Sequence, residues 1–297
     1  MILVVGATGL LGSEICRRLA ARNHQIRALV RTTSAPGRLD AVRACGAELV
    51  TGDLKDSGSL EAAVRGATAI ISTASSTLSR QPGDGIETVD LRGQLNLVEA
   101  ARAAGVSRFI FVSFRNAADV QYPLTVAKRK IEQAIPELPH YTIIQASWFM
   151  EVWLSPALGF DHPNARARIY GAGHNKISWI SFPNVAEFCV AAVENPAAER
   201  KIIEIGGPEP LSPLEVVRIF EEESGRQFQV EHVPEETLRA QMEAAADSLQ
   251  KSFAGIMLQY ARGDSIDMGP VLKQFPIPLT SVRDYARRIL GAQAASA

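Results

Sequence analysis

Residues 1–31 run MILVVGATGLLGSEICRRLAARNHQIRALVR, and the prediction of the fold starts from this segment. A short apolar segment leads directly into three evenly spaced glycines, Gly6, Gly9 and Gly12. A helical pattern follows the glycines, and a second apolar segment ends at Arg31. A strand that enters a glycine-rich turn and then a helix is the setting in which a dinucleotide-binding fingerprint occurs. The stretch predicts the first strand–helix–strand unit of a nucleotide-binding sheet.

The three glycines have a physical reason to stand where they do. Glycine permits the tight turn, the close approach of backbone to a pyrophosphate, and the close packing of the helix on the strand. The free backbone N–H groups at the helix start then face the anion. The spacing here is G-x-x-G-x-x-G and not the commoner G-x-G-x-x-G. A glycine-rich turn without a ligand is the alternative interpretation.

Apolar segments and helical patterns alternate through the first half of the chain. Further strands are expected at residues 48–51, 69–72, 109–113 and 142–145, with helices at 59–65, 85–104 and 124–135. Continuous Val, Ile and Leu runs are typical of strands that are buried on both faces. Strand–helix alternation implies right-handed crossovers. The predicted fold class is α/β, with a doubly wound, Rossmann-type parallel sheet.

The pattern becomes less regular after residue 147. Prolines and glycines become frequent, and short strands are expected at residues 176–180, 201–205 and 228–232. We therefore expect residues 1–147 to form a Rossmann-type domain that binds a dinucleotide. We expect residues 148–297 to form a smaller, discontinuously packed substrate lobe.

Composition limits the class of protein. The 297 residues are 46% hydrophobic and 21% charged, with a formal net charge of -1, which are ordinary values for a globular protein. No basic run indicates a nucleic-acid partner, and no apolar run approaches the roughly 20 residues of a membrane span. Three cysteines without a C-x-x-C pair favour a reducing cytoplasm and no zinc site. We expect a cytoplasmic monomer or homodimer with no metal.

Arg31 indicates which dinucleotide is bound. In NAD-binding folds a carboxylate usually ends the second strand and accepts a hydrogen bond from the adenosine ribose. Here the strand ends Ala28-Leu29-Val30-Arg31, and an arginine offers a planar, charge-assisted fork to a ribose 2′-phosphate. NADP(H) is therefore predicted to be preferred over NAD(H). A solvated surface arginine is the alternative.

Two further strand ends carry candidate cofactor contacts. Asp53 and Leu54 follow the third strand, where the carboxylate would bond the adenine amino group and the leucine would pack on the ring. An ordinary turn aspartate is the alternative for Asp53. Thr73 and Ala74 end the fourth strand, and their small size would let the chain pass beside the ribose and pyrophosphate.

The motifs together resemble the NmrA-like group of atypical short-chain dehydrogenase/reductases. GATGLLG, GDL, ISTAS, RFIFVSF, AKRKIEQAI, YTIIQASWFMEVW and IEIGGPEPLSPLEVV occur in this order and cover nearly the whole chain. The group includes isoflavone-reductase-like enzymes, NADPH-dependent quinone reductases, and cofactor-binding regulators without known catalysis. The resemblance implies an NAD(P)-binding fold and leaves the reaction open.

By position, the resemblance implies a set of cofactor contacts at five strand ends. They are Gly6, Thr8, Gly9, Leu10, Leu11 and Gly12 for the pyrophosphate, Arg31 for the 2′-phosphate, Asp53 and Leu54 for adenine, Thr73 and Ala74 for the ribose, and Ser113 and Phe114 for the nicotinamide side. It also implies that Trp148 and Phe149 lie near the nicotinamide or over the substrate. In relatives the preceding segment often contains Arg-Pro, whereas this chain has Gln145-Ala146.

Large apolar side chains gather after residue 147. Trp148, Phe149 and Trp153 are candidate substrate contacts, which would suit an aromatic or otherwise apolar small molecule. The alternative is that these rings belong to an ordinary core.

The catalytic acid is the open question. Short-chain reductases use Tyr-x-x-x-Lys, and the resemblance aligns Lys128 with the lysine, but Leu124 stands four residues earlier. Tyr122 lies six residues before Lys128, about 240° away around a helix axis if both were helical. Lys128 and Tyr122 are the candidate catalytic residues: Lys128 would bind the cofactor at the nicotinamide ribose and also the substrate oxygen, and Tyr122 or water would supply the proton. From spacing alone, Lys128 would be a surface lysine paired with Glu132.

The sequence is compatible with three functions. The first is an NADPH-dependent oxidoreductase that transfers hydride to a small apolar carbonyl, quinone or activated alkene. The second is a redox-sensing regulator that binds NADP(H) without turnover, which the missing tyrosine supports. The third is a sugar-nucleotide epimerase or dehydratase, against which the same missing tyrosine counts.

Overall fold

The computed structural model describes residues 1–79, 81–115 and 120–294. The chain divides into two compact units. The first unit comprises Met1–Phe114, Pro123–Gln145 and Val185–Ile203, and the second comprises Arg115–Tyr122, Ala146–Asn184 and Glu204–Ala297. The single boundary that we predict after residue 147 lies close to the change of unit after Gln145. Residues 185–203, however, return to the first unit.

The large sheet follows the predicted doubly wound plan. Its strands are β1 (Ile2–Val5), β2 (Ile26–Val30), β3 (Glu48–Thr51), β4 (Ala69–Ser72), β5 (Arg108–Phe114), β6 (Tyr141–Ala146) and β9 (Lys201–Ile205). Within the described residues this seven-stranded sheet has the order β3-β2-β1-β4-β5-β6-β9. β1 pairs in parallel with β2 and with β4, β2 with β3, and β4 with β5. The strand order reverses between β1 and β4, which is the point where such sheets bind ligands.

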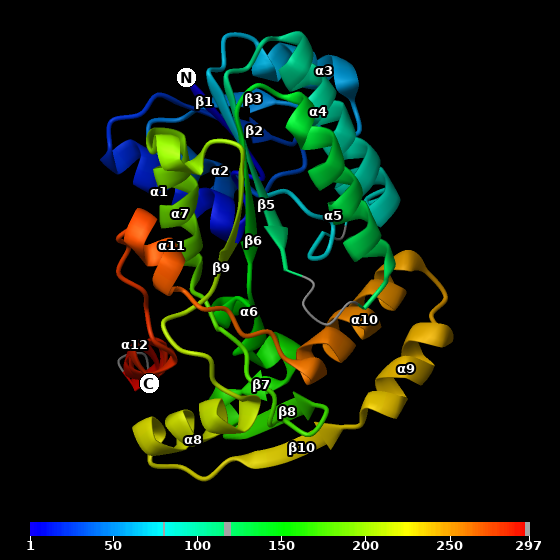
Figure 1. Ribbon diagram of the computed structural model, residues 1–297, viewed down its shortest axis with the longest axis vertical. Helices are drawn as coiled ribbons and strands as arrows, with labels where there is room; N and C mark the ends of the chain where they lie inside the picture. Colours follow the sequence, from blue (N-terminus) through cyan, green and yellow to red (C-terminus); the bar gives the residue numbers. More distant parts are fainter. Residues whose placement is uncertain (80, 116–119, 295–297) are drawn as a thin grey trace. The chain divides into compact units, whose positions relative to one another are not determined.

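Helices cover both faces of this sheet (Figure 1). They are α1 (Leu10–Ala21), α2 (Pro36–Ala44), α3 (Ser57–Val64), the π-helix η1 (Ile86–Gly93), α4 (Gln94–Ala103), α5 (Pro123–Ala134), the short 3-10 helices η2 (Ile135–Glu137) and η5 (Pro196–Ala198), and α7 (Phe182–Glu194). Figure 1 shows α1, α2 and α7 on one face and α3, α4 and α5 on the other. The helix that we expect over residues 85–104 is thus a π-helix followed by an α-helix.

The face under α3, α4 and α5 carries an apolar core. Leu3, Ile70 and Phe109 of the strands pack there with Leu97 of α4 and Ile131 of α5, each almost completely buried. The continuous apolar strands predicted from the sequence are therefore buried as expected, since helices lie on both sides of them.

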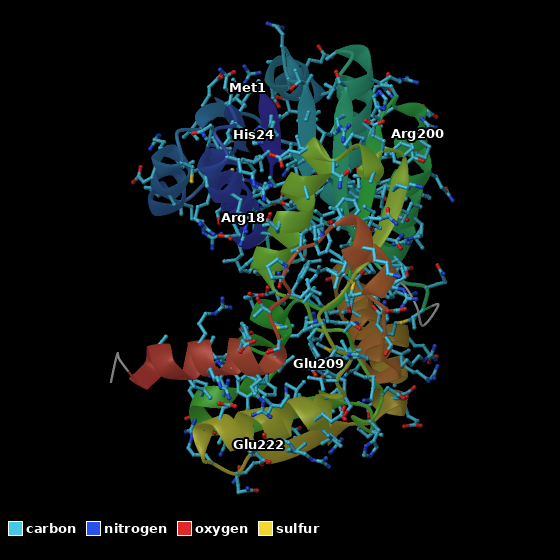
Figure 2. All side chains as sticks on the ribbon, turned by 60° about the vertical axis from the view of Figure 1, so that its left-hand side comes forward. Met1, Arg18, His24, Arg200, Glu209 and Glu222 are labelled. Carbon is cyan, nitrogen blue, oxygen red and sulfur yellow. The ribbon has the colours of Figure 1, made fainter. Side chains whose placement is uncertain are left out.

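Within the first unit, ion pairs link α7 to α1. Arg22 at the end of α1 contacts Glu194 of α7 at 3.1 Å, and the ring of His24 contacts the same carboxylate at 2.7 Å. Arg18 of α1 also pairs with Glu187 of α7. Figure 2 labels Arg18 and His24 on this face. α7 is thus tied to the helix that follows the glycines.

The second unit is built around a small sheet. Its elements are α6 (Met150–Trp153), η3 (Pro156–Leu158), β7 (Phe160–Asp161), η4 (His162–Asn164), β8 (Arg166–Tyr170), α8 (Pro213–Ser224), β10 (Gln229–Val233), α9 (Glu235–Glu243), α10 (Ser248–Arg262), α11 (Gly269–Gln274) and α12 (Val282–Ala294). The described strands have the order β10-β8-β7, with β8 parallel to β10 and antiparallel to β7.

One expected strand of this unit is wrong. Residues 176–180 form no strand. Instead, Ile177 makes isolated bridges to Leu211 and Asp264. Its backbone N–H donates to the carbonyl of Leu211, so the segment pairs with irregular chain and extends no ladder. No helix in the described ranges has both the length and the apolar character that a membrane span requires.

Candidate functional site

The glycine turn, residues 6–12, has the geometry that a phosphate cradle needs. Gly6 has a φ of +87°, and the N–H of Gly9 donates to its carbonyl at 2.9 Å. A Cβ on Gly12 would lie 2.1 Å from that carbonyl oxygen, so only glycine fits there. In the described chain no side chain caps the start of α1, and its first turn contains no acidic residue. The first N–H groups of α1 therefore suit an anion, and the turn fits a pyrophosphate.

The segment after β4 lies against the glycine turn. The N–H of Thr73 donates to the carbonyl of Val5 at 3.0 Å. A Cβ on Gly6 would lie 2.7 Å from the Thr73 hydroxyl and 2.9 Å from the N–H nitrogen of Ala74. Thr73 and Ala74 thus meet the turn where the strand order reverses, as a ribose contact there requires. The predicted roles of these residues stay predictions.

Gln94 supports this segment and was missed by sequence reasoning. Its side chain is completely buried. Its Oε1 accepts from the Ser72 hydroxyl at 2.8 Å, and its Nε2 donates to the Ala74 carbonyl at 2.9 Å. Gln94 begins α4 directly after the π-helix, and nothing in its sequence context distinguishes it from a surface glutamine.

The other residues of the turn differ in accessibility. The carbonyl of Thr8 accepts a hydrogen bond from Arg38 at 3.0 Å. Leu10 is 53% exposed, whereas Leu11 is 7% exposed and packs in the interior. Leu10 therefore offers apolar surface at the start of α1, and Leu11 supports the turn from beneath.

At the end of β3, both predicted adenine contacts have internal roles. One carboxylate oxygen of Asp53 accepts from the N–H of Lys55 at 2.9 Å, which closes a local turn. Leu54 is 6% exposed and belongs to the apolar core. Asn96 of α4 donates to the Leu54 carbonyl at 3.1 Å. These contacts hold the segment in place and leave the adenine role a prediction.

Arg31 meets a carboxylate that sequence reasoning missed. Its Nη1 lies 2.6 Å from Oδ2 of Asp84, and the Nζ of Lys55 lies 2.5 Å from Oδ1. The Ser79 hydroxyl also donates to Asp84. Burial raises the Asp84 pKa, but the hydrogen bonds from Lys55, Ser79 and Arg31 outweigh it and hold the pKa below its ordinary value. Arg31 and Lys55, the cation pair, thus form an anion-binding position.

Lys128 is buried and is no surface lysine. Its side chain lies against β5, where Nζ donates to the Val112 carbonyl at 3.3 Å and lies 4.6 Å from the centre of the Phe111 ring. Glu132 pairs instead with Arg129, at 3.0 Å. Burial lowers the Lys128 pKa, Asp90 and Glu132 oppose this shift, and Arg129 adds to it. Such a lysine is a candidate functional group.

Asp90 is a buried acid whose charge acts on Lys128. It lies on the π-helix η1 and is completely buried. Its Oδ2 accepts from the N–H of Ser76 at 3.0 Å and also from the Ser76 hydroxyl. Among the described residues its Oδ1 has no hydrogen-bond partner. Asp90 therefore supplies negative charge to the interior in which Lys128 lies.

The end of β5 is held by α5. Arg129 donates to the Ser113 hydroxyl at 3.3 Å and also to the Phe114 carbonyl. Ser113 is buried, and Phe114 is partly exposed. The predicted nicotinamide contacts thus lie on the same strand as the Val112 carbonyl that binds Lys128.

Tyr122 has its own partner in the second unit. Its ring is 2% exposed, and its hydroxyl donates to Oε1 of Gln259 at 2.7 Å. Nε2 of Gln259 donates to the Arg115 carbonyl at 2.7 Å. A Cβ on Gly255 of α10 would lie 2.4 Å from the tyrosine ring. This close packing gives Tyr122 a structural role in the second unit.

Two of the three predicted substrate residues come together in the second unit. Trp148 and Trp153 lie 4.5 Å apart between ring centres, and Trp153 stacks on Tyr260 at 5.3 Å. Tyr170 approaches Tyr260 edge-on at 5.5 Å. Phe149 packs elsewhere, on Phe182 at 4.9 Å. We call Trp148, Trp153, Tyr170 and Tyr260 the aromatic cluster.

Sequence reasoning missed two members of the cluster, Tyr170 and the residue that contacts the other three, Tyr260. It is buried near the end of α10, and burial raises its pKa far above its ordinary value, so it stays a neutral phenol. No motif surrounds it, and only the packing of the tryptophans reveals it.

In the described residues, no group of three or more His, Cys, Asp or Glu side chains is placed to hold a metal ion. A hollow of about 700 Å³ lies on the second unit beside β8 and β10, and its lining includes Leu158, Tyr170 and Met257. None of the three predicted substrate residues lines this hollow.

The sequence of this chain is similar to one family model and to several named proteins. A model of the NmrA-like family matches residues 1–269. An isoflavone reductase homolog of Zea mays is 30% identical, over 97% of this chain and 98% of its own length. The photosystem II assembly factor Ycf39 of Synechocystis is 29% identical, over 98% of this chain and 90% of its own length.

Solved structures give the same fold. An NADPH-dependent quinone oxidoreductase of Escherichia coli, solved with NADPH, superposes with a TM-score of 0.78 at 21% identity. The alignment covers 98% of this chain and 100% of that one. The similarity therefore extends over both units.

Proposed function

Because this chain belongs to the NmrA-like family, we propose that it is an NADPH-dependent oxidoreductase acting on a small apolar carbonyl, quinone or activated alkene. The observation that carries the proposal is the glycine turn where the strand order reverses, with the uncapped start of α1 behind it. The cation pair after β2 and β3 supports NADPH as the nucleotide. The names of the isoflavone reductase homolog and the quinone oxidoreductase agree with this class.

The residues would divide the binding of the cofactor among them. The glycine turn holds the pyrophosphate through backbone N–H groups, and Thr73 and Ala74 flank the ribose. Arg31 and Lys55 hold the 2′-phosphate through charge-assisted hydrogen bonds. When bound, the cofactor supplies a hydride to the acceptor. The protein then contributes orientation, charge and exclusion of water.

Lys128 is the residue that we propose to assist catalysis. An ammonium group has three donors, and the Val112 carbonyl uses one of them at 3.3 Å. The remaining donors are available to a ribose hydroxyl and to the oxygen of the acceptor. The Tyr122 hydroxyl donates a hydrogen bond to Gln259 instead, so its contacts favour Lys128 over Tyr122 as the catalytic group.

The aromatic cluster supports an apolar acceptor. Trp153 is its partly exposed ring, the other three rings are buried behind it, and the neutral phenol of Tyr260 adds one polar group. A quinone that accepts hydride leaves a stabilised phenolate-like anion, whereas a ketone leaves an alkoxide that needs a stronger acid. Since Lys128 is the one acid that we propose, quinones are the favoured acceptors.

A regulator that binds NADP(H) without turnover is the second candidate. Leu124 stands where short-chain reductases have tyrosine, and the Tyr122 hydroxyl is engaged in a buried contact. The photosystem II assembly factor shows by its name that close relatives include proteins with assembly roles. In this case the cofactor site would be kept and the acceptor site would have no substrate.

The proposal also includes the cellular location, the oligomeric state and the partners of the protein. We place the protein in the cytoplasm as a monomer or homodimer with a small-molecule substrate and no nucleic-acid partner. The three cysteines, Cys16, Cys45 and Cys189, are free thiols, as a reducing compartment would keep them.

A direct assay tests the proposed function. The purified protein is incubated with NADPH and a panel of quinones, aldehydes and enones, and loss of the reduced-nicotinamide absorbance is followed. Oxidation with at least one quinone supports the oxidoreductase. Tight NADPH binding without oxidation across the panel supports the regulator. Failure to bind either nicotinamide nucleotide contradicts both.

A further inference from the structure

Asp84 occupies the position where the proposed function places an anion of the cofactor. Its carboxylate touches Arg31 at 2.6 Å and Lys55 at 2.5 Å, and it also accepts from Ser79. The Asp84 side chain is 2% exposed, although Arg31 is 39% exposed and Lys55 is 30% exposed. The cations are thus open to solvent on one side and bound to an internal carboxylate on the other.

The two cations come from neighbouring strand ends. Arg31 follows β2 and Lys55 lies beyond β3, and these strands pair in parallel, so their carboxyl ends share one edge of the sheet. Asp84 comes from the segment between β4 and η1, 53 residues from Arg31 along the chain. The contact of Asp84 with Arg31 and Lys55 therefore depends on the tertiary structure and not on a local turn.

A ribose 2′-phosphate and the Asp84 carboxylate make the same chemical demand. Both are anions that accept charge-assisted hydrogen bonds from a guanidinium and an ammonium group. The phosphate carries the larger charge and one more acceptor oxygen, so it is the stronger ligand for two cations. One carboxylate and one phosphate at the same donors would repel each other at short range.

We propose that Asp84 is a specificity-determining residue, which competes with the 2′-phosphate of NADPH for Arg31 and Lys55. This inference rests on the proposed function, and it adds Lys55 as a second phosphate ligand. NADPH has to displace Asp84 from the cation pair. NADH has a 2′-hydroxyl in place of the phosphate, and it leaves Asp84 where it is. The Asp84 carboxylate therefore weakens NADPH binding and reduces the difference in affinity between NADPH and NADH.

Asp84→Asn is the test, because it keeps the shape of the side chain and removes the negative charge. Dissociation constants for NADPH, NADH and adenosine 2′,5′-bisphosphate are measured by titration calorimetry, with a thermal melt of each variant. Asp84→Asn should bind NADPH and the bisphosphate about tenfold more tightly, while NADH binding changes by less than about threefold. Asp40→Asn is the matched control, since Asp40 is 70% exposed in a surface pair with Arg43.

A second variant keeps the inference testable if Asp84→Asn does not fold. Lys55→Met should weaken NADPH and bisphosphate binding about tenfold and leave NADH within about threefold. Equal or weaker NADPH binding by a folded Asp84→Asn would overturn the competition, as would an unchanged NADPH affinity in Lys55→Met. If wild type binds NADPH and these shifts are absent, only this inference fails. If no variant binds either nucleotide, the proposed function fails with it.

Discussion

The glycine turn of the first unit and the aromatic cluster of the second are held in place by different means. In the turn, backbone determines the geometry, since a Cβ on Gly12 would lie 2.1 Å from the carbonyl oxygen of Gly6. In the cluster, side chains determine it, since Trp153 is positioned by stacking on Tyr260 at 5.3 Å.

The difference matters for what each region recognises. A backbone cradle presents N–H groups that suit any dinucleotide phosphate, so it tolerates few substitutions and gives little substrate choice. The cluster presents side chains, and of its four rings only Trp153 is partly exposed, so Trp153 is the position where the side chain can be changed at the lowest cost in stability. We expect substitutions in the turn to abolish binding, and substitutions in the cluster to change the choice of acceptor.

Gly12→Ala should have the largest effect. The added methyl group meets the Gly6 carbonyl and the Ala7 Cα, so either the turn or α1 must move. We expect a loss of about 3 kcal/mol in the free energy of unfolding and the loss of both NADPH and NADH binding. Urea unfolding and titration calorimetry measure these two quantities.

Gly37→Ala is the matched control for the glycine turn. Gly37 lies in α2, and a Cβ there meets nothing within 4 Å. Its free energy of unfolding should change by less than about 1 kcal/mol, in the stabilising direction. A Gly12→Ala protein that binds nucleotide as tightly as wild type would show that backbone packing does not determine this region.

Lys128→Met should have the next largest effect. It removes the buried ammonium while keeping an apolar side chain of similar length, so we expect kcat with a quinone to fall about a hundredfold. NADPH affinity should fall much less. Lys130→Met is the control, because Lys130 is exposed on the same helix. A quinone reductase activity that survives in Lys128→Met would contradict the catalytic role.

Tyr122→Phe separates the two catalytic candidates. It removes the hydrogen bond to Gln259, and we expect a loss of about 1 kcal/mol in the free energy of unfolding with kcat retained. Steady-state kinetics and urea unfolding give both values. A large fall in kcat together with unchanged stability would identify Tyr122 as the acid and reverse the assignment.

Trp153→Leu probes the aromatic cluster itself. Removing the ring that stacks on Tyr260 should raise KM for an aromatic quinone about tenfold and leave the NADPH dissociation constant unchanged. Phe228→Leu serves as the control, since Phe228 contacts Phe160 and Phe220 in a different part of the second unit. Equal KM changes in the two variants would show that the aromatic cluster has no specific role in substrate binding.

The smallest effect concerns pH. Burial lowers the pKa of Lys128 from its ordinary value of 10.5, and Asp90 and Glu132 only partly oppose this. Between the lowered pKa and 10.5 the unfolded chain binds more protons than the folded one, so the wild type gains stability as pH rises. The stability of wild type relative to Lys128→Met should therefore increase from neutral pH toward pH 10. A constant or decreasing difference in urea unfolding would show that Lys128 is not destabilised by burial.

Much of the fold could be predicted from the sequence, for a physical reason. Strands buried on both faces give continuous apolar runs, and β1, β4 and β5 lie where those runs predict them. The strand expected at 176–180 is wrong, because its apolar residues are buried against irregular chain and not against a neighbouring strand. Local pattern shows burial, but it does not show the pairing partner.

The residues of the candidate site also differ in how far the sequence predicts them. The glycine turn could be predicted because its requirements are local, and at Gly6 and Gly12 they exclude every residue but glycine. Asp84 and Tyr260 could not be predicted, because each is identified only by its contact with a residue far away in the sequence. Lys128 lies between these cases: its spacing to Glu132 favours a surface pair, and only the packing of α5 on β5 buries it.

The most direct test of the account is the affinity of wild type and Arg31→Ala for NADPH and NADH, measured side by side by titration calorimetry. We expect wild type to bind NADPH more tightly than NADH. Arg31→Ala should weaken NADPH binding about thirtyfold and NADH binding by less than about threefold, since only NADPH presents a phosphate to the guanidinium. Equal losses for the two nucleotides, or no binding of either by wild type, would contradict the claim that this edge of the sheet recognises NADPH.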